Sequence, residues 1–459
     1  MIYQPFDYQR TATQWILDNP SCGLFLDMGL GKTVSTLTAI QDLIDDCEIS
    51  RALVVAPKKV AETTWTTEAA KWDHLRGLRV AKVMGTEKQR KMALAEKADI
   101  YVIGRDNFVW LVGLYGGQLP FDVLVIDELT SFKNSKSQRF KAMRVARPSV
   151  HRVIGLTGTP APNGLIDLWG QLYCIDMGQR LGSSVTRYRE SHFETHKWNN
   201  IIVRCDVKKG HDDIIRNRIS DICLSMQAKD YLQLPDLMIH TVSVELPPAT
   251  MAAYNKFERE KVLEFKQEHE GESTNILANS AAGLMNKLAQ FANGAVYDEE
   301  HNVHEIHNEK VDKLAEIVEA ANGCSVLVFY QFKHDIPRIT KKLKGYRVEV
   351  YQGERQLVDW NAGKIDVLLA HPASTAYGLN MQQGGHYIVW FGTGWDLELF
   401  QQANARLHRQ GQKHHVIVYK LIGAHTVDER ASASLENKKA KQQSLLDSLN
   451  YLIRKHSNG

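Results

Sequence analysis

The stretch that decides the fold is Gly23-Leu24-Phe25-Leu26-Asp27-Met28-Gly29-Leu30-Gly31-Lys32-Thr33. The apolar run Gly23 to Leu26 predicts a short buried strand, and residues 34–44 predict a helix. A strand, a glycine turn and a helix in this order are the context of a phosphate-binding loop. Glycines let backbone N–H groups close around phosphate oxygens, and the helix N-terminus adds its positive dipole.

The side chains of this loop fit the same chemistry. Lys32 would reach the terminal phosphates of a nucleotide, and the Thr33 hydroxyl would bind a Mg²⁺ ion. The backbone groups that would cradle the phosphates belong to Met28, Gly29, Leu30 and Gly31. We therefore predict that the loop binds ATP together with Mg²⁺.

The composition of the whole chain sets the class of protein. Its 459 residues suffice for about two to four domains. The net charge of +3 is close to neutral, so any affinity for nucleic acid must come from a local groove. The six cysteines include no pair two or three residues apart, which disfavours a zinc ribbon and suits a reducing compartment. No apolar run approaches the roughly 18 residues of a membrane helix, and the N-terminus lacks signal-peptide features, so we expect a cytoplasmic protein without membrane contact.

Apolar runs that alternate with helical segments predict a first parallel sheet. After the strand at Gly23, these runs are residues 51–57, 100–104, 122–126 and 153–156. Ligands bind at the carboxyl ends of such strands, and the acidic pair Asp127-Glu128 directly follows one of them. One carboxylate there can hold Mg²⁺ and its neighbour can orient and deprotonate the attacking water. We assign Asp127 to the metal and Glu128 to the water.

Two further segments of the first half carry polar groups. Residues 6–17 predict an amphipathic helix, and the Gln9 amide on it could pair with the edge of adenine. The small-residue turn at 157–163 follows a strand and is consistent with a plain loop. In an ATPase with two lobes, such a turn can instead sense the γ-phosphate and pass its state to the other lobe.

The second half repeats the alternation. A second sheet without a phosphate loop of its own is predicted from residues 325–330, 347–351, 366–370, 387–391 and 416–419. Before it, residues 251–268 and 276–291 predict two helices. His301, His304 and His307 have a spacing at which a metal site is conceivable, but their acidic and Asn-rich flanks favour a solvated turn.

Basic residues mark two segments near the C-terminus. Arg406 and Arg409 are three residues apart, and we expect them on one face of a helix. They form either a plain basic face or a pair of arginine fingers that reach the γ-phosphate of a nucleotide held by the first lobe. The stretch from Asn437 onward predicts a basic amphipathic helix, either solvated or in contact with phosphate.

The order of these motifs resembles the superfamily-two helicases, and within them the Swi/Snf-like DNA translocase branch in its compact bacterial or bacteriophage form. The resemblance covers nearly the whole chain. The motifs that carry it are Tyr8-Gln9, Asp27 to Thr33, Val54 to Pro57, Asp127-Glu128 with Lys133-Asn134, Leu156 to Pro160 with Asn163, Val326 to Phe329, Gly378 to Asn380, and Gln402 to Gln412. The chain departs from the family at Leu129-Thr130, where a small residue and a histidine often follow the acidic pair.

The resemblance implies an α/β fold of two tandem RecA-like parallel-sheet lobes, with a helical insertion between motif III and motif IV. It places an ATP-binding lobe at residues 1–230 and a helicase lobe at 231–459, with the insertion at 250–309 and a helical tail at the C-terminus. The nucleotide contacts it implies outside the phosphate loop are Gln9 and Gly378. The catalytic residues it implies are Lys32, Asp127, Glu128, Arg406 and Arg409. The nucleic-acid contacts it implies are Lys58, Lys133, Asn134, Asn163 and Asn380.

From these observations we predict an ATP hydrolase that moves along DNA, chiefly through contacts with the phosphate backbone. Double-stranded DNA is the favoured track, and single-stranded DNA or RNA are the other tracks considered. One alternative is a helicase that separates the strands of DNA or RNA. Another is a clamp on DNA that ATP only switches, although the intact acidic pair and the arginines favour repeated hydrolysis.

Overall fold

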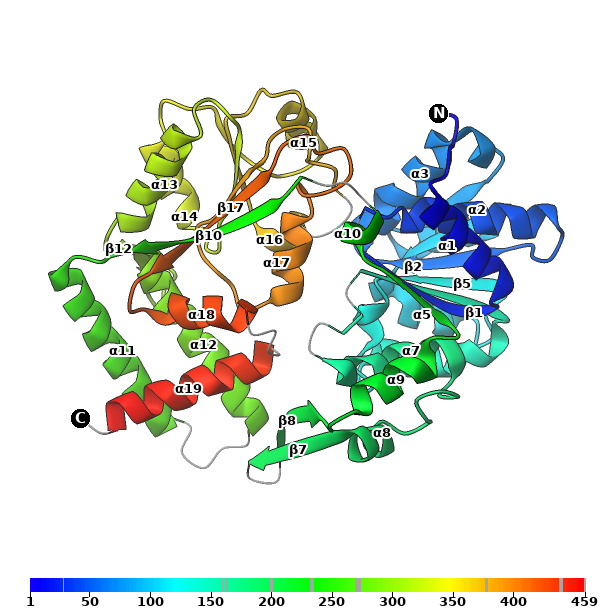
Figure 1. Cartoon of the computed structure of the whole chain (residues 1–459), viewed down its shortest axis with the longest axis horizontal. Helices are drawn as coiled ribbons and strands as arrows, with labels where there is room; N and C mark the ends of the chain where they lie inside the picture. Colours follow the sequence, from blue (N-terminus) through cyan, green and yellow to red (C-terminus); the bar gives the residue numbers. More distant parts are fainter. Residues whose placement is uncertain are drawn as a thin grey trace. The chain divides into compact units, whose positions relative to one another are not determined.

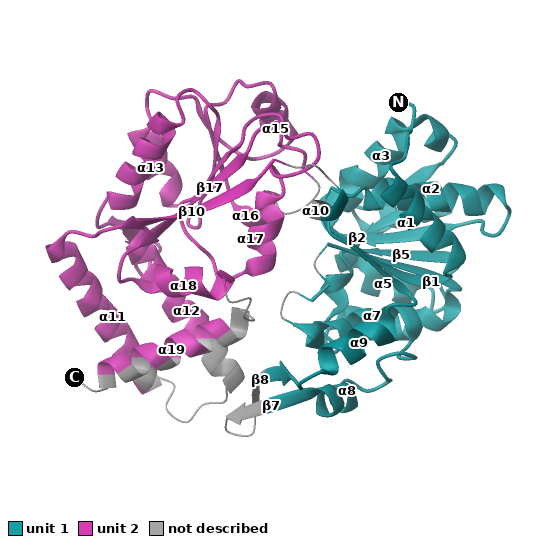
Figure 2. Cartoon of the chain, in the orientation of Figure 1, with its two compact units in different colours: residues 1–196, 205–233 teal, residues 197–204, 234–459 magenta. Residues whose placement is uncertain are grey.

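The computed structural model describes residues 1–27, 29–158, 160–161, 164–198, 201–231, 235–268, 274–375, 379–436 and 441–457. Three residues with predicted roles, Met28, Asn163 and Gly378, lie outside the described residues. The chain divides into two compact units, coloured separately in Figure 2. Unit 1 comprises residues 1–196 and 205–233, and unit 2 comprises residues 197–204 and 234–459.

Unit 1 is built on a parallel sheet of seven strands in the order β3-β4-β2-β5-β6-β1-β9. Its strands are β1 (Ser21–Leu26), β2 (Ala52–Ala56), β3 (Val80–Val83), β4 (Ile100–Gly104), β5 (Val123–Asp127), β6 (Arg152–Thr157) and β9 (Cys223–Met226). Every residue of β2 and β4 is buried. Such uninterrupted apolar runs suit a sheet that helices cover on both faces.

Helices flank this sheet on two sides. They are α1 (Asp7–Asp18), α2 (Lys32–Asp45), α3 (Trp65–Lys71), α4 (Glu87–Ala95), α5 (Phe108–Leu114), α6 (Gln138–Ala146), α7 (Leu168–Asp176), α8 (Val185–His192), α9 (His211–Ile219) and α10 (Ala228–Tyr231). One large core joins α5, α6 and α7 to the sheet through Phe108, Phe140 and Leu172. Figure 1 shows α1, α2 and α3 on the opposite side of the sheet from α5 and α7. Two short strands, β7 (Phe193–Trp198) and β8 (Ile201–Val207), form a separate small sheet.

Unit 2 is built on a parallel sheet of six strands in the order β10-β17-β16-β13-β15-β14. Its strands are β10 (Leu237–Val244), β13 (Val326–Phe329), β14 (Val348–Val350), β15 (Val367–Ala370), β16 (Tyr387–Trp390) and β17 (Val416–Gly423). The helices that connect them are α13 (Glu309–Ala320), α14 (Asp335–Lys342), α15 (Glu354–Asn361), α16 (Pro372–Thr375) and α17 (Leu397–Asn404), and α18 (Val427–Glu436) follows the last strand.

A helical module extends unit 2 beyond this sheet. It consists of α11 (Pro248–Glu268), α12 (Thr274–Asn293), the hairpin β11 (Ala295–Tyr297) and β12 (Val303–Glu305), and α19 (Lys441–Ser457). Leu288 on α12 and Leu449 on α19 belong to one buried apolar cluster, which also includes Phe332 and Val427 from the sheet side. Figure 1 shows α11, α12, α18 and α19 gathered together. The helix predicted at the C-terminus therefore packs its apolar face inside unit 2.

The predicted fold class is confirmed, because both units are parallel sheets with helices and the helical insertion lies between β10 and β13 of the second sheet. The apolar patterns of the sequence did not predict β3, β9 or β10. These strands are short or half-exposed, so their apolar pattern is weak; β3 and β9 have four residues each, and β10, at one edge of its sheet, is buried only at Val244. The domain boundary at residues 230 and 231 stays a prediction. Among the described residues, no helix combines the length and apolarity needed to cross a bilayer.

The solvated turn predicted for the three histidines is wrong for one of them. His301 and His304 are exposed in and beside the hairpin, and the His304 ring lies 2.8 Å from the Asp298 carboxylate. His307 is buried, and its Nε2 lies 2.9 Å from the Phe291 carbonyl oxygen. The spacing of three residues did not reveal this, because the chain leaves the hairpin between His304 and His307 and enters the core beneath α12.

Burial lowers the pKa of His307 to about 4, helped by the charges of Lys310 and Arg338. In the folded chain the ring stays neutral until the pH nears that value, whereas an ordinary histidine, with a pKa of 6.5, takes up its proton earlier. Between the two values the unfolded state binds more protons, so falling pH favours unfolding. We expect the midpoint temperature of thermal unfolding to decrease when the pH is lowered from 7 to 5. The decrease should be smaller in His307→Gln.

The matched control is His240→Gln, which changes an exposed histidine on β10. This variant should keep the pH dependence of the native chain. An unchanged pH dependence in His307→Gln would contradict the assignment.

Candidate functional site

The phosphate loop connects β1 to α2 at the carboxyl edge of the first sheet. Gly31 caps α2 with a φ of +73°, and Gly29 has a φ of +88°. Side chains are strained in this left-handed region, so glycine is the residue that suits both positions. A Cβ on Gly31 would stand 2.3 Å from the amide nitrogen of Gln9. The loop backbone therefore approaches its neighbours more closely than any other residue type would allow.

The Lys32 ammonium lies over the start of this loop. Its Nζ donates hydrogen bonds to the carbonyl oxygens of Leu26, at 2.6 Å, and of Asp27, at 3.2 Å. It also lies close enough to Asp127 for its charge to lower the pKa of that carboxyl group. Thr33 follows in the first turn of α2 and is half-buried. The structure thus places the predicted lysine and threonine together at the N-terminus of one helix.

Gln9 lies in the first turn of α1 and is buried against the loop. Its Oε1 accepts a hydrogen bond of 3.0 Å from the Phe6 N–H, which closes the N-terminus of the helix. Its Nε2 faces Gly31. A two-point contact with adenine would use this amide nitrogen and the second lone pair of the oxygen. The position beside the phosphate loop suits the predicted role, which stays a prediction.

The acidic pair stands where β5 ends. Asp127 Oδ2 accepts a hydrogen bond of 3.0 Å from Trp65 Nε1, and Oδ1 accepts one of 3.1 Å from the Glu128 N–H. Burial raises the pKa of Asp127, while the Trp65 hydrogen bond and the Lys32 charge act in the opposite direction. The two hydrogen-bond donors and the Lys32 charge therefore favour the ionised form of the Asp127 carboxyl group, whereas burial disfavours that form.

Glu128 has an unusual backbone. Its φ of 55° and ψ of 62° are left-handed, although it is not a glycine. Such a conformation costs about 1–2 kcal/mol and persists where the surrounding structure enforces it, often at functional sites. The 3₁₀ turn η4 (Leu129–Phe132) follows at once, and Leu129 packs so closely on β6 that a Cβ on Gly155 would meet it at 2.7 Å. This packing fixes the direction in which the chain leaves β5.

The groups at this edge suit Mg²⁺. The ion prefers oxygen ligands and is usually held by one or two protein groups together with phosphate oxygens. The Asp127 carboxylate and the Thr33 hydroxyl supply oxygens of this kind, beside a loop whose left-handed glycines leave room for phosphate. These two residues would hold the ion.

Sequence reasoning missed Trp65. It is fully buried, and its indole N–H is the side-chain donor to Asp127. A π-helical turn, η1 (Val60–Thr64), directly precedes it and shifts the register of the helix that follows β2. A buried tryptophan needs an acceptor for its N–H, and this requirement is the signal that could have found it.

A glutamine of α7 contacts the turn at 157–163. Thr159 and Pro162, like Asn163, lie outside the described residues. Gln171 is fully buried, and its Nε2 donates to the carbonyl oxygens of Pro160 and Asp167. This glutamine therefore ties Pro160, within the turn, to α7. Nothing in its sequence context marked it.

The predicted nucleic-acid contacts of unit 1 already take part in local structure. Lys133 Nζ lies 3.5 Å from an Asp167 oxygen, and a Cβ on Gly170 would stand 2.5 Å from the Lys133 carbonyl. Asn134 is exposed, and its Oδ1 accepts from the Lys136 N–H at 2.9 Å. Lys58 is exposed just after β2. Their roles toward nucleic acid stay predictions.

Unit 2 brings Arg406 and Arg409 together, but not on a helix as predicted. The helix α17 ends at Asn404, and both arginines lie in the turns that follow. Arg409 Nη1 donates to the Leu379 carbonyl oxygen at 3.0 Å, and Arg406 Nη1 donates to the same oxygen at 3.4 Å. The expectation of a shared helix face is therefore wrong. A shared acceptor brings the two guanidinium groups together instead.

The two arginines differ in burial. Arg406 is 6% exposed and also donates from Nε to the Gln402 carbonyl oxygen, whereas Arg409 is half-buried. Gln412 braces the same turns, because its Nε2 donates to the carbonyl oxygens of Gln382, Gly385 and Leu407. Asn380 is exposed beside Leu379. Arg409 is thus the arginine better placed to reach a ligand, and Arg406 the one better placed to hold the loop.

Two family models match the chain. The model described as SNF2-related domain matches residues 8–295, and the model described as Helicase conserved C-terminal domain matches residues 309–411.

Individual proteins are similar over most of this chain. Protein p41 of Acyrthosiphon pisum secondary endosymbiont phage 1 is 37% identical over 97% of this chain and 99% of the phage protein. A Mycoplasma genitalium protein named as an uncharacterised ATP-dependent helicase is 26% identical over 97% of this chain, which spans only 42% of that protein. The solved structure of the Sulfolobus solfataricus SWI2/SNF2 ATPase core in complex with dsDNA covers 95% of this chain and 93% of that chain, with 22% identity and a TM-score of 0.46.

The contact between Trp65 and Asp127 generates a prediction about the metal. We expect Trp65→Phe to fold and to hydrolyse ATP, but to need about tenfold more Mg²⁺ for half-maximal rate, which is typical of losing a donor to a metal ligand. The measurement is the rate of phosphate release as a function of Mg²⁺ concentration.

The matched control is Trp169→Phe, which removes a buried indole that donates to the Gly182 carbonyl oxygen at 2.9 Å. It should leave the Mg²⁺ dependence unchanged. If Trp65→Phe and Trp169→Phe needed the same Mg²⁺ concentration for half-maximal rate, this result would contradict a positioning role for Trp65.

Proposed function

We propose that this chain, which belongs to the SNF2-related family, is a DNA-dependent ATPase that uses hydrolysis to move along double-stranded DNA. Members of the family use ATP, and this chain is an ATP-hydrolysing enzyme with helicase relatives. The choice of DNA as the track and of translocation as the output is our proposal. We place the activity in the cytoplasm of a bacterial or infected host cell.

One observation carries the catalytic part of the proposal. Lys32, Asp127 and Trp65 lie at one edge of the first sheet, and their contacts favour an ionised carboxylate next to a lysine. Phosphoryl transfer depends on positioning and charge stabilisation more than on covalent chemistry, so a cation beside a metal-binding carboxylate is the arrangement it needs.

The chain's own groups have distinct roles in this reaction. The Lys32 ammonium would move from the carbonyl oxygens of Leu26 and Asp27 to the terminal phosphates of ATP. Glu128, set at an angle to the strand by its left-handed backbone, would orient and deprotonate the attacking water. When bound, Mg²⁺ supplies charge neutralisation at the phosphate oxygens.

Unit 2 would contribute the remaining charge. Arg409 is half-buried and held by the Leu379 carbonyl oxygen, in the segment that follows Gly378. An arginine that stabilises the transition state from a second unit makes hydrolysis depend on the arrangement of the two units. Each round of hydrolysis would then change that arrangement, and such a change is what a motor needs to step.

The support for DNA as the track is chemical. The mycoplasma relative is named a helicase, and enzymes of that class act on nucleic acid. In this chain Lys58, Lys133 and Asn134 follow strand ends of unit 1, and Asn380 is exposed beside the arginine turns of unit 2. Lysine and amide groups bind phosphates without reading sequence, and such binding weakens as salt rises.

The test compares tracks and outputs. We expect ATP hydrolysis to rise most with double-stranded DNA, and the stimulated chain to displace the third strand from a triplex without opening a forked duplex. Lys32→Ala is the matched control: it should abolish hydrolysis and displacement, because the phosphates lose their lysine. The measurements are phosphate release and gel separation of the displaced strand, each at two salt concentrations.

Other outcomes would select the rivals. Stimulation chiefly by single strands or RNA, with opening of the fork, would contradict translocation on duplex DNA and favour a strand-separating helicase. Tight ATP-dependent binding to DNA with less than one turnover per binding event would favour a switched clamp.

A further inference from the structure

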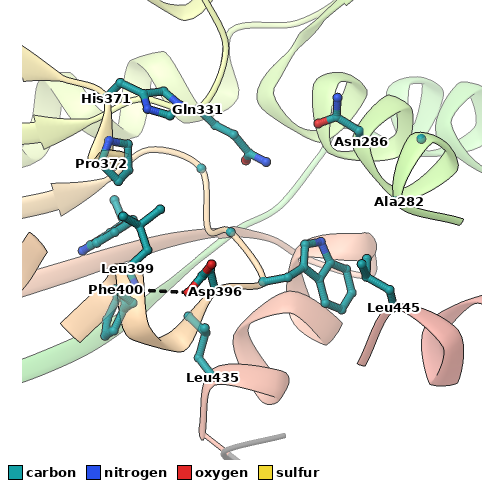
Figure 3. Close-up of a pocket in the computed structure, with 15 residues that line it drawn as sticks. Ala282, Asn286, Gln331, His371, Pro372, Asp396, Leu399, Phe400, Leu435 and Leu445 are labelled. Carbon is teal, nitrogen blue, oxygen red and sulfur yellow. Dashed lines mark hydrogen bonds between the residues drawn. The ribbon is translucent and has the colours of Figure 1, made fainter. Parts of the chain in front are cut away.

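Buried amide oxygens that accept no hydrogen bond from the described residues occur in both units. In unit 2, Gln331 Oε1 stands beside a pocket of about 470 Å³ between α12 and the segment after β16 (Figure 3). Trp390 and Phe400 of this pocket pack on each other, with ring centroids 4.8 Å apart, and none of its described lining residues has a predicted role in hydrolysis. In unit 1, one such glutamine is Gln171 on α7, which contacts the turn at 157–163.

The surroundings of Gln171 are apolar. The residue is fully buried, and its helix neighbours Leu172 and Ile175 belong to the large core of unit 1. Its Nε2 donates to the carbonyl oxygens of Pro160, at 2.5 Å, and of Asp167, at 2.9 Å. A leucine would fill the same space without burying an amide oxygen that lacks a described donor, and such burial costs stability. The presence of an amide here is therefore explained by the two bonds that it donates.

The turn at 157–163 leaves the first sheet between the two groups that would hold the nucleotide. Strand β6 lies between β5 and β1. The register pairs Leu156 with Asp127 on β5, and Thr157 with Phe25 on β1. The acidic pair therefore lies on one side of the turn, and the phosphate loop begins on the other. Any shift of this turn is a shift beside the nucleotide site.

The helix that carries Gln171 also contacts the segment after the acidic pair. A Cβ on Gly170 would stand 2.5 Å from the Lys133 carbonyl oxygen and 2.9 Å from the Phe132 carbonyl oxygen. Just before the helix, the Asp167 carboxylate lies 3.5 Å from the Lys133 ammonium, and the Asp167 side chain is only 13% exposed. Lys133 is a predicted nucleic-acid contact. A phosphate group that draws its ammonium away would take a cation from a largely buried carboxylate.

These contacts form a continuous route from Lys133 to the turn. The Lys133 ammonium faces the Asp167 carboxylate, the Asp167 carbonyl oxygen accepts from the Gln171 amide, and the same amide donates to the Pro160 carbonyl oxygen. Packed protein interiors are barely compressible, so a displacement at Asp167 is passed on and not absorbed.

We propose that Gln171 is a positioning residue that couples nucleic-acid binding at Lys133 to ATP hydrolysis through the turn at 157–163. A phosphate bound to Lys133 would loosen its ion pair with Asp167, and the Gln171 amide would pass the resulting shift to the Pro160 carbonyl. The turn would then move relative to the acidic pair and the phosphate loop, and hydrolysis would become faster. This inference rests on the proposed action on DNA, and it names the route by which DNA regulates the site.

The test compares stimulation by duplex DNA in matched variants. Gln171→Leu keeps the size of the side chain and removes both donated bonds. The matched control is Tyr188→Phe, which removes a buried hydrogen bond of 2.8 Å to the Leu165 carbonyl oxygen, close to α7 but outside the route. The measurement is the rate of phosphate release at saturating ATP, with and without saturating duplex DNA. The ratio of the two rates is the stimulation.

We expect the stimulation to fall about fivefold in Gln171→Leu, a size typical of residues that couple two sites. The loss should appear in kcat with DNA and not in the KM for ATP, because the two donated bonds do not reach the nucleotide. Tyr188→Phe should keep the native stimulation. Gln171→Met also lacks the donors, and it replaces Gln171→Leu if circular dichroism shows that this variant fails to fold. Native stimulation in the folded variant would overturn the proposal.

A double-mutant cycle tests the route itself. Asp167→Asn removes the charge that faces Lys133 but keeps the backbone carbonyl that Gln171 contacts. It should also lower the stimulation. If both residues act on one route, Asp167→Asn combined with Gln171→Leu loses no more stimulation than Gln171→Leu alone. Losses that multiply in the double variant would show two independent effects and would contradict the route.

The same measurements separate this inference from the proposed function. If duplex DNA stimulates the native chain and Gln171→Leu equally, the route fails and the proposed function stands. If single strands or RNA stimulate hydrolysis instead, the duplex track fails, and a loss of that stimulation in Gln171→Leu would support the route. If no nucleic acid stimulates the native chain, both proposals fail.

Discussion

The candidate site depends on the contacts that favour the charged form of Asp127 against burial, which raises the pKa of this carboxyl group. Removing a carboxylate from water costs several kcal/mol, and hydrogen bonds to a charged group each return about 1.5–3 kcal/mol. The Trp65 indole and the Glu128 N–H supply two such bonds, and Lys32 supplies a positive charge nearby. These donors come from the chain after β2, the end of β5 and the helix after β1. The site therefore exists only when β1, β2 and β5 are in place within the first sheet.

The burial of the parallel strands explains why much of the fold and of the site could be predicted from the sequence. Parallel strands covered on both faces must be apolar along their length, so polar side chains gather where the strands end. Lys32, Asp127 and Glu128 each follow an unbroken apolar run, which is why the sequence alone placed them at one edge. In the second sheet, the apolar runs likewise identified β13, β15 and β16 closely. Both sheets and the helical insertion could therefore be predicted from the apolar patterns of the sequence and from its resemblance to the family.

What the sequence did not reveal depends on contacts between distant residues. Trp65 and Gln171 are linked to the site by hydrogen bonds across 62 and 11 residues, and neither has a local pattern that signals this. The arginines were expected on a helix, yet α17 ends at Asn404 and the Leu379 carbonyl oxygen joins them. The buried position of His307 and the pocket beside α12 likewise arise only when the helical module packs on the second sheet.

The central claim is that unit 1 binds the nucleotide and Arg409 of unit 2 completes its hydrolysis. The most direct measurement is ATP affinity beside the single-turnover hydrolysis rate in Arg409→Ala, with Arg409→Lys as the variant that keeps the charge. The account predicts affinity within about threefold of the native chain and a rate lower by roughly a thousandfold, as for arginine fingers elsewhere. Lost affinity with an unchanged rate at saturating ATP would contradict it.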